Sequence, residues 1–115
     1  MNKRALSYRQ EKRVAKSLDG KVQANSGATL WQKGDVILKR HGILLECKTK
    51  EAESESFSIK KMWLEKIKRE AFGMGLNPSR ATLVFDFGDE VPFYVISEQF
   101  FKEILSLLEQ ESIND

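Results

Sequence analysis

The 115-residue sequence has a single cysteine and no apolar run long enough to cross a membrane. Because one cysteine cannot form an internal disulfide, Cys47 indicates a reducing compartment, and we expect a cytoplasmic protein. A spanning helix needs about 20 consecutive apolar residues, which argues against a membrane-embedded class. The basic N-terminus also lacks the apolar stretch of a secretory signal. Without repeats, low-complexity tracts or long linkers, the chain is expected to form one domain over residues 1–115.

Positive and negative charges are unevenly distributed along the chain, although the net charge is only +2. Residues 1–21 and 60–69 are rich in lysine and arginine, whereas the chain from Asp86 onward is mostly acidic. Two basic stretches favour a positively charged side on the folded domain. The alternative is that they are ordinary solvated helix faces, and charge alone does not identify the partner.

Hydrophobic periodicity and turn residues predict eight elements in the order α-β-β-β-α-β-β-α. The predicted helices cover residues 8–18, 59–73 and 97–109, and the predicted strands cover 21–25, 35–40, 43–49, 81–86 and 92–96. Ser7, Ser58 and Ser97 are the expected helix caps. Trp63 and Phe72 are expected in the core. This order predicts an α/β fold with a mixed central sheet flanked by helices.

The predicted hairpin over residues 35–49 carries the strongest sign of chemistry. Side chains alternate between the two faces of a strand, so Glu46 and Lys48 share one face, and Cys47 lies on the other as a small core residue. A turn at His41-Gly42 pairs the two strands and can bring Asp35 close to Glu46. Adjacent carboxylates repel, so they need a counter-charge. Hard oxygen ligands suit Mg²⁺ or Mn²⁺.

Two carboxylates fall in otherwise apolar patterns. Glu46 interrupts an apolar strand, and Glu11 lies inside a helical stripe formed by Val14, Ala15 and Leu18. Charged side chains are rarely buried without partners, so both positions favour a nearby cation. The alternatives are an exposed Glu-Lys face on an ordinary hairpin, and a glutamate at the rim of its stripe.

With these residues the chain resembles the PD-(D/E)xK nuclease superfamily. The matching positions are Glu11 on the first helix, Asp35 in Gly34-Asp35-Val36-Ile37, and Glu46-Cys47-Lys48 on the next strand. Within that superfamily it is similar to the archaeal-type and phage Holliday junction resolvases, which also have a Ser-Gly loop, here 25–28. Gly34 replaces the proline of the family name. Nickases, repair nucleases and restriction enzymes share the same short motif.

The resemblance implies a restriction-endonuclease-like core and an Mg²⁺- or Mn²⁺-dependent endonuclease of DNA recombination and repair. It implies Glu11, Asp35, Glu46 and Lys48 as catalytic residues, and Asp35, Glu46, Glu11 and the backbone carbonyl of Cys47 as metal ligands. Candidate DNA contacts, from charge and position, are Arg4, Arg9, Lys12, Ser26, Lys60 and Lys61. The expected substrate is a four-way junction. Flaps, mismatches or duplex DNA, and a catalytically silent DNA-binding module, are the alternatives.

A homodimer is also expected, since symmetric incision of a junction needs two active sites and a two-fold pair is the commonest way to supply them. The last predicted helix gives separate support. Its apolar side chains span an arc of about 160° at about 100° per residue, which is wider than one core-facing stripe needs. These side chains are Phe100, Phe101, Ile104, Leu105, Leu107 and Leu108. The alternative is a helix docked deeply on its own domain.

Overall fold

The computed structural model describes residues 2–23 and 34–114, except for the side chains of 113 and 114. The elements are α1 (Lys3–Leu18), β1 (Lys21–Val22), β2 (Val36–Leu38), β3 (Ile43–Lys48), α2 (Lys61–Gly73), the 3-10 turn η1 (Pro78–Arg80), β4 (Thr82–Phe85), β5 (Phe93–Val95) and α3 (Glu98–Asn114). The predicted α/β class and the predicted order of helices and strands are confirmed.

One five-stranded sheet runs in the order β1-β2-β3-β4-β5. β3 and β4 are parallel, with α2 in the connection between them, and the other neighbouring pairs are antiparallel. The register places Leu45 of β3 opposite Val36 on one side and Thr82 on the other. The mixed sheet is therefore as predicted, and β3 lies at its centre.

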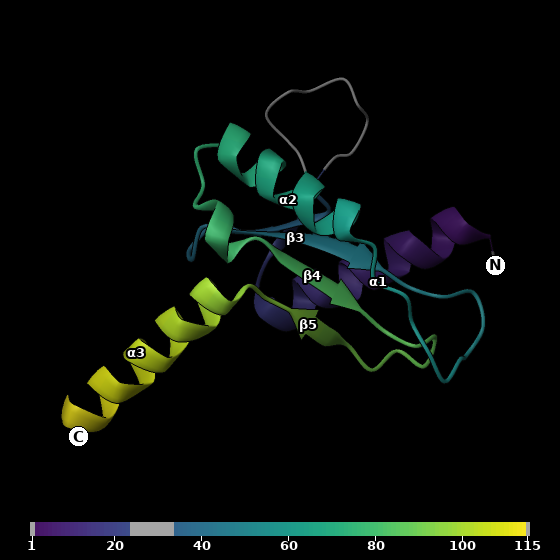
Figure 1. Cartoon of the computed structure of the whole chain (residues 1–115). Coiled ribbons are helices and arrows are strands. Elements are labelled where there is room, and N and C mark those ends of the chain that lie inside the picture. Colours follow the sequence, from purple (N-terminus) through teal and green to yellow (C-terminus); the bar gives the residue numbers. More distant parts are fainter. Residues whose placement is uncertain (1, 24–33, 115) are drawn as a thin grey trace.

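α1 and α2 cover opposite faces of this sheet (Figure 1). Val14 and Ala15 of α1 pack on a core that includes Leu45 and Cys47, which confirms Cys47 as a core-facing residue. On the other face, Ile67 and Ala71 of α2 pack against Leu44, Ile37 and Ala81. Because strand side chains alternate, Glu46 and Lys48 point to the α2 face.

The first two predicted caps are wrong, and the third is confirmed. α1 begins before Ser7, and Asn2 caps it by accepting a hydrogen bond from the Ala5 amide at 2.8 Å. α2 begins after Lys60, so Ser58 lies in the extended segment before it. Ser97 Oγ accepts from the Phe100 amide at the start of α3. The prediction that Phe72 lies in the core is wrong, since its side chain is 74% exposed. Its neighbour Ala71 faces the core, and consecutive residues of a helix point in different directions.

α3 projects away from the sheet (Figure 1). Its first turns pack on η1, through an Arg80–Glu103 ion pair and a hydrogen bond from Ser97 Oγ to the Ser79 carbonyl. The expected alternative of a deeply docked helix is therefore wrong, since Phe101, Leu105, Leu107 and Leu108 are exposed. In the described part of the chain, no helix has the length and apolar character needed to span a bilayer.

Candidate active site

Asp35 is fixed at the start of β2 by the backbone around it. The Cys47 amide donates to Asp35 Oδ2 at 2.7 Å, and the Asp35 amide donates to the Leu45 carbonyl at 2.9 Å. Gly34 precedes it with φ +75°, and a Cβ there would come within 2.6 Å of Leu44 Cγ. Proline, with φ near −65°, cannot adopt this conformation. Glycine is therefore required at position 34 of this turn.

Glu46 lies at the centre of the sheet and is only 5% exposed. Its Oε1 is 3.7 Å from Lys48 Nζ and 3.7 Å from Lys66 Nζ. Its buried Oε2 has no hydrogen-bond partner among the described residues. Burial, together with the negative charge of Asp35, raises the pKa of Glu46 above its ordinary value. The two lysines therefore compensate this carboxylate only in part.

Glu11 approaches the same two carboxylates from α1. Burial raises the pKa of Glu11 from 4.5 to about 7, with further contributions from the charges of Asp35 and Glu46. Burial also raises the pKa of Asp35. The structure thus brings Glu11, Asp35 and Glu46 within electrostatic reach of one another. Across the described ranges, no three His, Cys, Asp or Glu side chains are already arranged to hold a metal ion.

The pKa of Glu11 predicts a pH-dependent stability in chelator. Between pH 4.5 and about 7, the folded state keeps a proton that the unfolded state has released, so stability falls as pH rises through this window. Glu11→Gln removes this effect. Because Glu11 is partly exposed, screening limits the gain in unfolding free energy at pH 8 to about 1–2 kcal/mol, and the gain should vanish at acidic pH.

Urea unfolding of both proteins at the two pH values measures this gain. Glu55→Gln, in an exposed loop position, is the control and is expected to leave stability unchanged at both. A Glu11→Gln protein less stable than the unmodified protein at pH 8 would contradict the inferred repulsion.

Lys48 extends from the end of β3 toward α2. Its Nζ lies 4.6 Å from the centre of the Trp63 ring, within the range of a cation–π interaction. Its backbone carbonyl accepts a hydrogen bond from Gln10 Nε2 at 2.7 Å. α1 and α2 therefore both contact Lys48, from opposite faces of the sheet, and hold it beside Glu46.

Sequence reasoning missed two charged residues of α2 that belong to this site. Lys66 Nζ lies 3.7 Å from Glu46 Oε1 and 3.6 Å from Glu70 Oε1. Glu70 Oε2 is buried without a hydrogen-bond partner in the described part of the chain. The i, i+4 spacing of Lys66 and Glu70 was a detectable signal of an ion pair. It gave no sign that the pair faces the carboxylates.

A buried polar network behind Lys48 was also missed. Gln10 and Asp86 are each 1% exposed, and Gln10 Nε2 lies 3.4 Å from Asp86 Oδ2. Asp86 Oδ1 accepts hydrogen bonds from Thr49 Oγ1 at 2.6 Å and from the Gly88 amide at 2.8 Å. This network ties α1, β4 and the residue after Lys48 together, so it fixes the position of the end of β3.

The predicted DNA contacts occupy both helices beside Lys48. Arg4, Arg9 and Lys12 are exposed on α1, and Lys60 and Lys61 are exposed at the start of α2. Four of them already have neighbours: Arg9 pairs with Glu90 at 3.1 Å and Lys61 with Glu65 at 3.7 Å, and Lys12 and Lys60 lie over the Tyr8 and Trp63 rings. Ser26 and the loop 25–28 lie outside the described residues.

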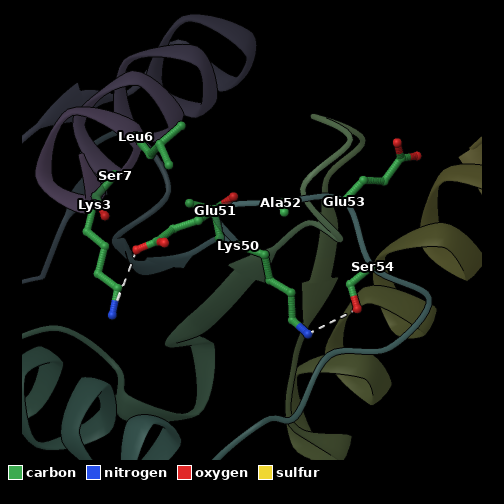
Figure 2. Close-up of a pocket in the computed structure, with 9 residues that line it drawn as sticks. Lys3, Leu6, Ser7, Lys50, Glu51, Ala52, Glu53 and Ser54 are labelled. Atoms are coloured by element: carbon green, nitrogen blue, oxygen red, sulfur yellow. Dashed lines mark hydrogen bonds and ion pairs between the residues drawn. The ribbon is translucent and has the colours of Figure 1, made fainter. Parts of the chain in front are cut away.

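A cleft of about 590 Å³ opens between the first turns of α1 and the segment that follows β3. Figure 2 shows its lining, in which Lys3 pairs with Glu51 and Lys50 Nζ lies 3.2 Å from Ser54 Oγ. Its lining carries both signs of charge and includes none of Glu11, Asp35 and Glu46. The cleft is therefore separate from the carboxylate site, to which α1, β3 and the residue before β2 contribute Glu11, Glu46 and Asp35.

Comparison of the chain with protein-family models, with curated proteins and with solved structures finds no match.

Proposed function

We propose that this protein is a metal-dependent endonuclease that cuts branched DNA, such as four-way junctions, as a homodimer. The observation that carries the proposal is the buried pair of carboxylates Asp35 and Glu46, with the ammonium group of Lys48 3.7 Å from Glu46 Oε1 and with Glu11 within electrostatic reach. Such a set of acidic groups and a cation is suited to phosphodiester hydrolysis.

The residues present fit a divalent cation in their donor chemistry and charge. Burial is the largest cause of the raised pKa values of all three carboxylates, and neighbouring negative charge raises the pKa values of Glu11 and Glu46 further. Glu46 Oε2 is a buried acceptor with no hydrogen-bond partner in the described ranges. Carboxylate oxygens suit Mg²⁺ or Mn²⁺. Asp35 and Glu46 would hold the ion, with Glu11 directly or through water, after turning toward one point. The Cys47 carbonyl stays a predicted further ligand. When bound, the ion supplies Lewis acidity at the phosphate.

Lys48 and Lys66 have different proposed roles. Lys48 stabilises negative charge that develops on the phosphate, and Trp63 and Gln10 hold it in place for this. Lys66 pairs with both Glu46 and Glu70, and we assign it as a counter-ion of the carboxylates.

Incubation with Mg²⁺ and four-way junctions, flaps, mismatched duplex and linear duplex of matched sequence tests the function. The proposal expects junctions to be cleaved fastest, and it expects chelator to stop cleavage. If only the other substrates are cleaved, the protein would still be a nuclease, but its substrate would not be the four-way junction. Tight binding without cleavage of any of them would instead identify a silent DNA-binding module.

DNA affinity is expected to fall steeply with salt, because the exposed lysines and arginines that flank the site contact phosphates and release counter-ions. Branched DNA differs from duplex in the placement of its backbones, so such contacts can select it without reading bases. Lys60→Ala should weaken binding of all sequences alike and reduce the magnitude of the salt slope by about 1. Fluorescence anisotropy across a salt series measures the slope. The same slope for Lys60→Ala and the unmodified protein would remove Lys60 from the DNA surface.

A further inference from the structure

An apolar groove of about 200 Å³ remains open on the α1 face of the sheet. Leu38, Leu45 and Thr82 form part of its floor, and the atoms that it exposes are apolar. Leu18 at the end of α1 and Phe100 at the start of α3 also line it. The groove opens beside Leu18, the last residue of α1, where Tyr94 of β5 is 40% exposed.

α3 presents a second uncovered apolar surface beside this groove. The described residues include eleven exposed large hydrophobic side chains, and four of them lie on α3. Phe101, Leu105 and Leu108 are 52%, 43% and 55% exposed and follow one another at spacings of four and three, so they form one stripe. Contiguous apolar surface of this kind marks an interaction site.

The charges around the two surfaces are complementary. Besides Glu103, which pairs with Arg80, α3 carries Glu98, Glu109 and Glu111 against a single lysine, Lys102. Exposed Lys39 lies in the turn that joins the groove residues Leu38 and Ile43, next to Arg40, which is 3.7 Å from Asp19, and exposed Lys16 lies in the last turn of α1. An acidic apolar helix and an apolar groove with a basic rim belong to the same chain. The partner that fits both surfaces at once is a second copy of this chain.

We propose that the α3 stripe of one copy lies in the groove of a second copy, and that the same contact is made in return about a two-fold axis. α3 starts at the edge of its own groove and projects outward from Ser97, whose hydroxyl is bonded to both Ser79 and Phe100. The helix therefore extends away from its own groove. Reciprocal exchange between two copies buries both surfaces and closes the assembly. The inference rests on the homodimer of the proposed function but uses none of the carboxylate site.

Light scattering coupled to size exclusion at micromolar concentration tests the interface. The unmodified protein is expected at about twice the chain mass of 13.2 kDa. Leu105→Asp and Leu108→Asp place a charge in the apolar contact and should raise the dimer dissociation constant by about 100-fold or more. Phe72→Asp is the matched control, because Phe72 is 74% exposed on α2 and should leave the dimer intact. Circular dichroism checks that each variant is folded.

Hydrogen–deuterium exchange then tests where α3 lies. Leu105→Asp is expected to lose protection in both α3 and β5 relative to the unmodified protein, and Tyr94→Lys at the groove should also give single chains. Loss of protection in α3 alone, or an unmodified protein that stays a single chain at 100 micromolar, would overturn the proposal. A dimer that fails to cleave any DNA would contradict the nuclease and leave the interface standing.

Discussion

Asp35→Asn is expected to abolish DNA cleavage while leaving the fold intact. The asparagine keeps an oxygen that can accept the Cys47 amide, now 2.7 Å from Asp35 Oδ2, so the start of β2 should not move. It removes one of the charges that would hold the cation. It also relieves repulsion among three carboxylates whose pKa values are already raised. The Asp35→Asn protein should therefore lose metal binding and cleavage, while its folding stability stays unchanged or increases.

Three measurements separate these effects. Calorimetric titration with Mn²⁺ should show weaker binding by about 10-fold or more, single-turnover cleavage should be undetectable, and junction affinity in chelator should be equal or tighter. Asp89→Asn, at an exposed loop position, is the control and should behave as the unmodified protein. Full cleavage by the Asp35→Asn protein, or by the unmodified protein in excess chelator, would end the proposed mechanism.

Lys48→Ala is expected to slow single-turnover cleavage by about 10²-fold or more, with little change in DNA affinity. The reason is that Lys48 Nζ stands beside Glu46 and over the Trp63 ring, so in the proposed mechanism it would meet the phosphate at the reacting position. An interaction used mainly in the transition state lowers the barrier without adding to ground-state binding.

Comparison with two other lysines makes this test specific. Lys68→Ala, at an exposed position of α2, should change neither rate nor affinity. Lys66→Met should act through Mn²⁺ affinity, since Lys66 contacts Glu46 and Glu70. An unchanged rate with a raised dissociation constant for DNA would make Lys48 a phosphate contact and remove it from the chemistry.

The sequence was sufficient to predict features that depend on local pattern. Alternation along β3 placed Glu46 and Lys48 on one face, and the helical stripe on α1 directed Glu11 toward the sheet. The starts of the helices were harder to predict. A serine that could cap a helix does not show whether the residues before it also belong to that helix. Nothing in residues 3–7 breaks a helix, so α1 extends back to the better cap at Asn2.

The supporting residues could not be predicted in the same way. Gln10 and Asp86 are separated by 76 positions, and their contact exists only because α1 and β4 pack around the end of β3. Lys66 and Glu70 face the site because α2 crosses β3 at one particular angle. Such contacts depend on how elements pack in three dimensions, which no local periodicity records.

The short strand β5 at the edge of the sheet limits how copies of this protein can associate. β5 has only three residues, and Pro92 directly before it has no amide hydrogen to offer a neighbouring strand. Strand addition, the usual route from an open sheet edge to filaments and cross-β aggregates, therefore finds little to pair with on this side. We expect concentrated solutions to contain small closed assemblies with no binding of amyloid dyes, even though the chain exposes so much apolar helix.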